Sequence, residues 1–408
     1  MVVYDYDGIR FLQLFPGDSV MKIVQICTNA MSGSVGKIAR DINEELGKRG
    51  YESTVCYGRG KDYISRGFRI ESSFSVISHA IFARLFDSDG LHSIVSTKRL
   101  IRFLEEFKPD IIHLHCLHGY YINYPLLVEY IRKARIKVVW TMHDCWAFTG
   151  HCAFYDYIGC SKWTKLCFNC PQKHSYPKSL LWDGAKRNYK LKKRLFTSLN
   201  SDRIVIVTPS HWLKTELSKS FLNSIECRVI YNDVSDDVFF ADSNLKRKKV
   251  ILGVANVWDR RKGLLDFIGL SQYVPSDYEI LIVGASEKQI EYMAKFGVKA
   301  IGRTSNSNEL AQLYRTSTIL FNPTYEDNYP TVNVEAIKCG LPVVTYNSGG
   351  SSEIIKRTGM GLVVEKKDYK SVIEYLDVAY TAKPLNNQFD NSMLDEYLNL
   401  YNELYKRD

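Results

Sequence analysis

Short apolar runs alternate along the chain with longer segments in which apolar residues recur every three or four positions. The runs are typical of strands buried on both faces of a sheet, and the longer segments are typical of helices that cover such strands. The pattern predicts strands at 22–27, 110–115, 136–142, 203–207, 228–234, 250–255, 278–284, 318–321 and 342–345. It predicts helices after Gly36 and at 97–107, 210–220, 264–272, 307–316, 368–381 and 391–406.

A polar, charged stretch at residues 235–249 interrupts this alternation, after which the pattern starts again. Two series of alternating strands and helices predict an α/β protein with two Rossmann-like domains facing a cleft. A chain of 408 residues is long enough for two such domains. We expect the first domain at 21–235, the second at 236–385 and a last helix within 386–408.

The composition, 45% hydrophobic and 24% charged, is typical of a globular protein. No run reaches the 18 apolar residues that a spanning helix needs; Ser75 to Phe86 comes nearest, and His79 and Arg84 break it. Residues 1–20 lack the layout of a secretory signal, so we expect an upstream extension there. Ten cysteines without a signal indicate a reducing compartment, and therefore a cytoplasmic location.

The formal net charge of +9 suits contact with an anionic surface. Basic residues concentrate in a predicted helix at 186–196, where Tyr189, Leu191, Leu195 and Phe196 are interleaved with them. Such a helix is typical of peripheral contact with anionic lipid headgroups at the inner face of a membrane, although a solvated helix face explains it equally well. No recognised nucleic-acid module accompanies it, so nucleic acid is not an expected partner.

The stretch from Tyr325 to Glu353 carries the strongest chemical signal. A polar loop containing Pro323 and Pro330 follows the apolar run 318–321, and a short helix then leads to Gly340. In an open α/β sheet, ligands bind at loops that follow the carboxyl ends of strands. This loop is therefore the first candidate for a binding site.

Two carboxylates frame the loop, Asp327 within it and Glu335 on the following helix. A carboxylate accepts hydrogen bonds from two hydroxyls, so one could hold a ribose and the other a sugar ring. The helix N-terminus between them offers free N–H groups and a positive dipole end to a phosphate. A lone acidic loop is more often an ordinary helix cap, but the surrounding residues add to this signal.

Glu335-Ala336, Cys339-Gly340 and Pro342-Val343-Val344 resemble the donor-site signature of the retaining glycosyltransferase family 4. The resemblance covers about residues 21–380. It implies the GT-B fold and transfer of a sugar, with retention, from a nucleoside-diphosphate sugar. It implies no metal or other cofactor for the transfer itself.

Two positions depart from the family pattern. The first acidic position falls on Asp327 by spacing, with Glu326 one residue earlier, so either carboxylate is a candidate for contact with the sugar. The family has glycine where this chain has Pro330, and proline has no N–H to donate. One backbone donor to the sugar is therefore missing.

The resemblance also assigns roles outside this stretch. Lys262-Gly263 matches a turn that neutralises the donor diphosphate; the family's arginine falls on Val257, so Arg261 or Arg260 would substitute. His143 matches a histidine that contacts the transferred sugar, with a satisfied core histidine as the alternative. The implied catalytic residues are His143, Lys262, Arg261 and Asp327. The implied donor-binding residues are Gly33, Gly36, Lys262, Glu326, Asp327, Asn328, Tyr329, Thr331 and Glu335.

In this family architecture the first domain binds the acceptor, the second binds the donor, and the last helix crosses back onto the first domain. The expected partners are a nucleotide sugar and a growing polysaccharide or lipid-linked glycan. A sugar-nucleotide epimerase of the same fold and a non-catalytic nucleotide-sugar-binding subunit are alternatives. A NAD enzyme is disfavoured because no G-x-G-x-x-G follows the strand at 22–27.

Four cysteines gather in a predicted insertion at 150–172: Cys152, Cys160, Cys167 and Cys170. The last two form a Cys-x-x-Cys pair, which is half of a typical zinc site. The aromatic and lysine-rich residues between the cysteines offer little apolar core of their own. We therefore expect a structural zinc that holds the insertion, away from the transfer chemistry.

His113, His115 and His118 cluster at the end of the strand predicted at 110–115. Packing and hydrogen bonding at a strand terminus are expected of His113, whereas His118 lies past the strand and is expected to approach the cleft. Asp87-Ser88-Asp89, like Asp5-Tyr6-Asp7, resembles a metal-binding Asp-x-Asp. Neither ends an apolar strand, so we expect solvated acidic turns.

Overall fold

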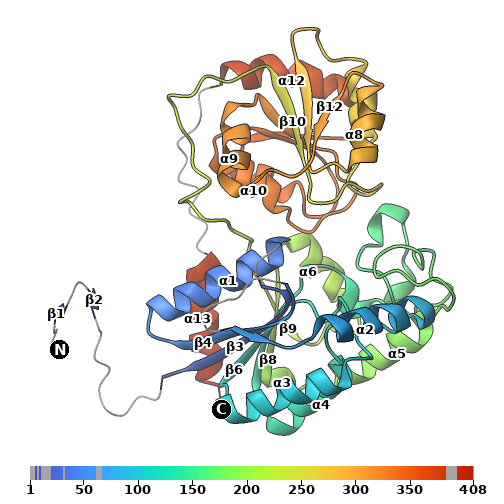
Figure 1. The fold of residues 1–408 in the computed structure, drawn as a ribbon, viewed down its shortest axis with the longest axis vertical. Coiled ribbons are helices and arrows are strands. Elements are labelled where there is room, and N and C mark those ends of the chain that lie inside the picture. Colours follow the sequence, from blue (N-terminus) through green and yellow to red (C-terminus); the bar gives the residue numbers. More distant parts are fainter. Residues whose placement is uncertain are drawn as a thin grey trace.

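The computed structural model describes residues 20–30, 33–60, 67–382 and 393–407, together with a short antiparallel pair, β1 (Asp5–Tyr6) and β2 (Ile9–Arg10). Apart from that pair and Val20, the extension expected at 1–20 lies outside the described residues. Two α/β lobes, each built around its own sheet, are arranged one above the other (Figure 1).

The first lobe contains a seven-stranded parallel sheet in the order β5-β4-β3-β6-β7-β8-β9. Its strands are β3 (Lys22–Asn29), β4 (Glu52–Arg59), β5 (Gly67–Arg69), β6 (Ile111–Leu114), β7 (Lys137–Thr141), β8 (Ile204–Thr208) and β9 (Glu226–Val229). Its helices are α1 (Gly33–Lys48), α2 (Ser73–Phe86), α3 (Ile94–Phe107), α4 (Tyr124–Ala134), α5 (Ala185–Phe196) and α6 (His211–Ser218). Short 3-10 turns are η1 (Trp146–Phe148), η2 (Asp156–Ile158), η3 (Lys162–Thr164) and η4 (Ser201–Arg203).

The second lobe contains a six-stranded parallel sheet in the order β12-β11-β10-β13-β14-β15. Its strands are β10 (Val250–Val254), β11 (Glu279–Val283), β12 (Lys299–Ile301), β13 (Ile319–Asn322), β14 (Val343–Tyr346) and β15 (Gly361–Val364). Its helices are α7 (Asp266–Ser271), α8 (Glu287–Ala294), α9 (Ser307–Thr316), α10 (Thr331–Lys338), α11 (Glu353–Thr358) and α12 (Tyr369–Thr381). The prediction of two α/β domains with parallel sheets is confirmed.

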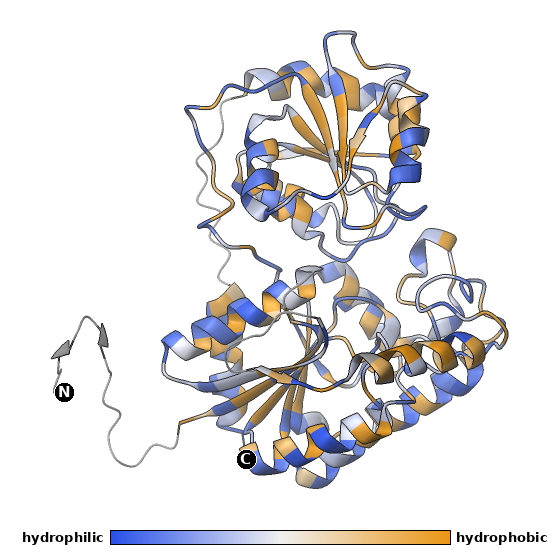
Figure 2. Ribbon diagram, viewed as in Figure 1, coloured by the Kyte–Doolittle hydropathy of each residue, from blue (hydrophilic) through white to orange (hydrophobic). Residues whose placement is uncertain are grey.

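The apolar strands lie at the centre of each lobe, and helices such as α1 turn their polar sides outward (Figure 2). In α1, the predicted period places Ile38, Ile42 and Leu46 against the sheet, all buried. A side chain on Gly36 would place its Cβ 2.7 Å from the Asn29 carbonyl oxygen, so glycine permits the close approach of helix and strand. In the described part of the chain, none of the helices has the length and apolar character needed to cross a bilayer.

The last described helix, α13 (Met393–Tyr405), lies against the first lobe (Figure 1). It buries Met393, Leu400 and Leu404 in the same cluster as apolar residues of α1 and the first sheet. Two tyrosines on it reach polar groups of that sheet: Tyr401 bonds to His113 Nδ1 at 2.6 Å, and Tyr397 to Thr141 Oγ1 at 2.8 Å. The helix therefore completes the core of the domain from which it is most distant in sequence.

Candidate active site between the two domains

Two loops meet at the carboxyl ends of β10 and β13. Gly263, in the loop after β10, has φ +75°, and a Cβ on it would lie 2.2 Å from the Pro323 carbonyl oxygen in the loop after β13. Only glycine combines that backbone conformation with so close an approach. The Tyr325 N–H then donates to the Arg261 carbonyl at 2.7 Å and holds the two loops together.

Asp327 is the centre of charge in this pair of loops. Its Oδ2 forms an ion pair with Lys262 Nζ and lies 3.7 Å from Arg261 Nη1. Burial would raise the pKa of Asp327, but the Lys262 and Arg261 charges outweigh it and lower that pKa. The structure thus brings together three of the four predicted catalytic residues, Asp327, Lys262 and Arg261.

Glu326, the neighbouring carboxylate, points toward the other domain. Its Oε1 and Oε2 accept hydrogen bonds from the backbone N–H groups of Tyr155 and Tyr157, each at 3.1 Å, in the cysteine-containing insertion. Burial raises the pKa of Glu326 to about 7, against the effect of these two N–H groups. Of the two candidate carboxylates, Asp327 is the one that faces the basic residues.

Asn328 connects the loop to His143, which follows β7 in the first domain. The Asn328 side-chain amide donates to the His143 carbonyl, and its Oδ1 is buried without a hydrogen-bond partner. The His143 ring bonds through Nε2 to His115 Nδ1 at 3.0 Å. Burial lowers the pKa of His143 to about 4, against the opposing charge of Asp144, so its imidazole is neutral at pH 7.

Glu335 lies on α10, one turn inside the helix that begins after Pro330. Its Oε2 accepts a hydrogen bond from the Tyr314 hydroxyl at 2.8 Å, and burial raises its pKa to about 7. Lys37 of α1 in the first domain lowers that pKa by its charge. The helix has no side-chain cap, so N–H groups at its N-terminus, beginning at Thr331, remain available to a ligand.

The remaining predicted donor-binding residues differ in how exposed they are. Gly33 begins α1 with φ +75° and is exposed, whereas Gly36 is buried against Asn29. Tyr329 is buried among the apolar residues of the second domain, where its hydroxyl accepts a hydrogen bond from Arg357 at 3.0 Å. A donor-binding role for these residues stays a prediction.

Glu353 and Lys37 were not singled out from the sequence. Glu353 of α11 accepts hydrogen bonds from the His211 and Trp212 N–H groups, at 2.9 and 2.7 Å, at the start of α6 in the first domain. A carboxylate at a helix N-terminus is a favourable partner for its free N–H groups. The sequence does indicate that α6 begins after Ser210, which caps the helix. It contains no pattern that would pair this helix N-terminus with Glu353, more than a hundred positions away.

His118 belongs to a polar group beside His143. Its Nε2 bonds to Asp144 Oδ2 at 2.8 Å and its Nδ1 to the Tyr176 hydroxyl at 2.9 Å. Burial would lower the pKa of His118, but the Asp144 charge raises it well above its usual value. Within the described ranges, Cys116, His118 and Asp144 are the one group with three candidate ligand atoms within 4.8 Å of one another. Both ring nitrogens of this histidine are, however, already bonded.

The four cysteines of the insertion lie near one another without forming such a group. Cys152 and Cys170 interact directly through their side chains, and the Gly150 N–H donates to Cys167 Sγ at 3.2 Å. Cys160, Cys167 and Cys170 all pack against the core cluster that contains Cys152. The structural zinc stays a prediction.

The insertion packs aromatic residues into the main core of the first domain, which the sequence did not predict. Trp163 is buried between Phe148 and Tyr155, with ring centroids 5.1 and 4.7 Å away, in the main core cluster of the first domain. Aromatic rings bury large areas even in short segments without regular secondary structure. The insertion therefore has a source of stability that is independent of a metal.

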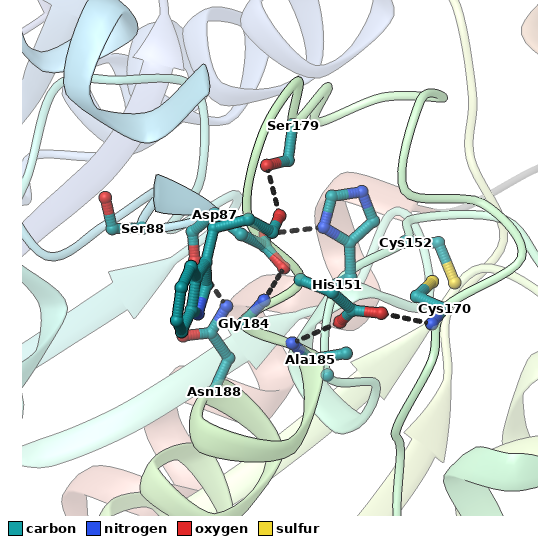
Figure 3. Close-up of polar contacts among 12 residues, drawn as sticks. Asp87, Ser88, His151, Cys152, Cys170, Ser179, Gly184, Ala185 and Asn188 are labelled. Atoms are coloured by element: carbon teal, nitrogen blue, oxygen red, sulfur yellow. Dashed lines mark hydrogen bonds and ion pairs between the residues drawn. The ribbon is translucent and has the colours of Figure 1, made fainter. Parts of the chain in front are cut away.

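Asp87 and Asp89 are not the solvated turn that the sequence suggested. Asp87 Oδ1 bonds to His151 Nδ1 at 2.6 Å and its Oδ2 accepts from the Gly184 N–H at 2.7 Å, as Figure 3 shows. The Asp89 carboxylate accepts from the Gly119 and Tyr120 N–H groups, each at 3.1 Å. Buried carboxylates are stable in such positions because N–H donors replace water.

Both halves of the chain match glycosyltransferase family models. The model for "Glycosyltransferase Family 4" covers residues 35–238, and the model for "Glycosyl transferases group 1" covers residues 235–393. The chain belongs to glycosyltransferase family 4. It is therefore a glycosyltransferase of polysaccharide biosynthesis with the GT-B fold.

The putative colanic acid biosynthesis glycosyl transferase WcaC of Escherichia coli strain K12 is 26% identical, over 94% of this chain and 100% of the relative. Among solved structures, sucrose-phosphate synthase of Thermosynechococcus elongatus superposes with a TM-score of 0.67 at 15% identity, covering 95% of this chain and 100% of the other. HepE of Anabaena, in complex with UDP-glucose, superposes with a TM-score of 0.60 at 14% identity, covering 94% and 99%. These likenesses do not favour the epimerase alternative.

Proposed function

We propose that this glycosyltransferase moves a sugar from a nucleoside-diphosphate sugar to a growing polysaccharide or lipid-linked glycan, with retention and without a metal. The observation that carries the proposal is the Lys262–Asp327–Arg261 cluster, which lies where the loops of the second domain meet the first. Binding of UDP-glucose by the structural neighbour HepE supports the choice of donor class.

The two basic residues have the charge that a leaving diphosphate requires. Lys262 and Arg261 are only 19% and 12% exposed, so their interactions are less screened by water than those of surface charges. An incoming diphosphate would compete with Asp327 for the two cations. Fixed cations and helix N–H groups stabilise a departing diphosphate directly, so no metal is needed for that step.

The carboxylates and the amide then have hydroxyl-binding roles. Glu335 would accept hydrogen bonds from the ribose. Asp327, once released from Lys262, and the unpartnered Oδ1 of Asn328 would accept them from the donor sugar. Glu326 would join this set only by leaving the Tyr155 and Tyr157 N–H groups.

Retention is best explained by a front-face reaction. Asp327 is held by two cations and Glu326 by two N–H groups, so neither carboxylate stands free as a nucleophile. The acceptor oxygen forms its bond to the anomeric carbon on the face from which the diphosphate departs, and the departing phosphate oxygen takes the acceptor's proton. The neutral ring of His143 would hydrogen-bond to the sugar or to the acceptor.

A panel of nucleotide sugars, followed by mass spectrometry, tests the proposal. The protein should cleave at least one of them and, with acceptor, release the nucleoside diphosphate and a lengthened glycan of unchanged anomeric configuration. Lys262→Ala should lose most of the turnover while melting near the wild-type temperature, and Lys288→Ala, at an exposed position of α8, should keep it. Binding of a donor without any cleavage would instead indicate the non-catalytic subunit.

A further inference from the structure

Helix α2 carries apolar side chains into solvent. Phe74 is 82% exposed, Ile77 59%, Ile81 52% and Phe86 48%, and the helix has no acidic residue. A helix on the surface of a globular protein normally turns its apolar residues inward. Apolar colour runs along the outside of α2 in Figure 2. This surface is unusual for a helix that faces water only.

A second apolar segment is fixed beside the end of α2. The N–H of Leu180 donates to the Arg84 carbonyl at 2.6 Å, and the N–H of Trp182 donates to the Leu85 carbonyl at 3.1 Å. Leu181 is 70% exposed and Trp182 61% exposed. Phe74, Ile77, Ile81, Phe86, Leu181 and Trp182 together are called the apolar face below. Contiguous exposed apolar residues of this kind mark an interaction surface.

The border of the apolar face is basic. Arg187, at the start of α5, donates to the Phe86 carbonyl at 3.1 Å, which fixes this end of α5 beside α2 (Figure 1). Lys178, Lys186 and Lys190 are exposed nearby in sequence. Between residues 171 and 199 the chain has eight lysines and arginines but one acidic residue, Asp183.

The few carboxylates near this border are already bonded inside the protein. Asp183 accepts hydrogen bonds from the Cys170 and Ala185 N–H groups, at 2.6 and 2.9 Å. Asp87 is bonded to His151 and Gly184 (Figure 3). Among the residues that the structure describes, the exposed charge of this border is therefore positive.

Helix α5 cannot supply the apolar part of a membrane contact by itself. Its Tyr189 and Phe196 are buried, and they pack edge-on against Phe221 and Trp140 with ring centroids 5.2 and 4.7 Å apart. Its outward side offers cations alone. The interleaved aromatic residues that suggested a membrane helix at 186–196 thus face the core, and the apolar contribution has to come from α2 and Trp182.

We propose that the apolar face and the basic start of α5 dock together on a bilayer that contains anionic lipids. Aromatic and aliphatic side chains enter the interface, and lysine and arginine pair with the headgroups around them. A second copy of this chain fits less well, because its border would bring the same positive charges together. The inference rests on the proposed function, because this surface would bring the enzyme to a membrane-borne acceptor. Membrane binding itself can be tested without the acceptor.

Sedimentation with vesicles tests the docking surface directly. The full-length protein should bind vesicles containing phosphatidylglycerol, bind pure phosphatidylcholine vesicles much more weakly, and lose binding as salt is raised. The double variant Phe74→Ser/Trp182→Ser should weaken binding by about tenfold or more, and Lys186→Glu/Lys190→Glu should weaken it on anionic vesicles alone. Val378→Ser removes an equally exposed apolar side chain from α12 in the second domain and should change nothing.

Unchanged melting temperatures would show that these variants fold. Wild-type protein that ignores both kinds of vesicle, or a double variant that binds as well as Val378→Ser, would overturn the docking surface. Light scattering measures the oligomeric state and tests the remaining outcome. If the wild type is a dimer and Phe74→Ser/Trp182→Ser is a monomer that binds vesicles as well as the wild type does, the apolar face binds a second copy of the chain instead. Donor cleavage measured in solution separates failure of the docking surface from failure of the proposed function.

Discussion

Neighbouring acidic residues in one loop serve two different domains in this protein. Asp327 is held by Lys262 and Arg261, whereas Glu326 binds two N–H groups of the insertion. Burial raises the pKa of both, yet the pKa of Asp327 is lowered because the Lys262 and Arg261 charges outweigh burial, whereas that of Glu326 is raised to about 7 because the two N–H groups and the Arg261 charge do not. Their roles follow from these partners, and exchanging the two is not expected to preserve function.

Glu335→Ala tests the ribose assignment. The variant should bind the donor about ten- to a hundredfold more weakly, because a hydrogen bond to a charged acceptor contributes about 1.5–3 kcal/mol. Isothermal calorimetry with the nucleotide sugar measures the change. Glu287→Ala, at an exposed position of α8, is the matched control. Equal affinities of the two variants would remove Glu335 from the donor site.

Glu335 should also make stability depend on pH. Its pKa in the folded chain is raised to about 7, above the value of about 4.3 for an unfolded chain, so the folded state binds the proton more tightly. Its contribution to stability is present below about pH 4.3 and is lost as the pH rises to about 7, a change of about 4 kcal/mol at most. Glu335→Gln keeps an acceptor for Tyr314 but cannot titrate. The difference between its melting temperatures at pH 5 and pH 8 should therefore be smaller than that of the wild type. A pH dependence identical to that of the wild type would show that Glu335 does not titrate in this range.

At the scale of elements, glycine turns position the basic residues. Gly263→Ala places a Cβ 2.2 Å from the Pro323 carbonyl oxygen, whereas Gly297→Ala meets nothing within 4 Å at a similar φ of +71°. The control should cost about 1 kcal/mol of folding free energy for the left-handed backbone. Gly263→Ala should cost about 1–3 kcal/mol more and reduce turnover, since the loop must shift away from Asp327. Denaturant melts and donor cleavage measure both effects; equal losses in the two variants would contradict the turn's positioning role.

The cysteine-containing insertion provides a second test at this scale. Protein purified without added metal should contain about one zinc per chain, since thiolate zinc sites bind tightly. Cys167→Ser/Cys170→Ser should lose it, and Cys227→Ser, a cysteine of β9, should keep it. Native protein without zinc, whose four thiols all react freely, would refute the zinc site and would show that contacts such as the aromatic packing around Trp163 hold this segment without a metal.

Strands and helices with a clear period were predictable, and elements without one were not. The buried runs of β6, β7, β8, β10, β11, β13 and β14 stood out because both faces are covered. Helix α2 did not, because its apolar residues lie on all sides and therefore show no helical period. The roles of Glu326 and Asp327 could not be told apart from the sequence. Neighbouring residues in an irregular loop can point in opposite directions, and no periodic pattern in the sequence shows which way each one points.

At the scale of the whole molecule, two carboxylates of the second domain bind backbone N–H groups of the first. Glu326 reaches the insertion and Glu353 reaches the start of α6. Asn328 adds a third contact, to the His143 carbonyl. The domains are thus held in the arrangement that brings His143 near the basic loop.

Glu326→Ala/Glu353→Ala should loosen this arrangement. Each lost hydrogen bond between a charged group and an N–H contributes about 1.5–3 kcal/mol, so separated domains should become populated. Small-angle scattering should show a larger radius of gyration, and the Michaelis constant for the donor should rise. Glu365→Ala, an exposed carboxylate of the second domain, should leave both unchanged. A scattering curve equal to that of the wild type would mean that other contacts hold the domains.

The position of α13 has a consequence for how the protein is made. A ribosome releases the strands of the first domain well before α13, because Tyr397 and Tyr401, which hydrogen-bond to Thr141 and His113 inside that domain, lie 256 and 288 residues after these two partners. Until then one side of the first sheet lacks part of its cover, and nascent chains with exposed apolar surface are prone to aggregation. The first of the two domains is therefore completed only after the second has been translated, and chaperones that shield nascent chains should matter more for it than for the second domain.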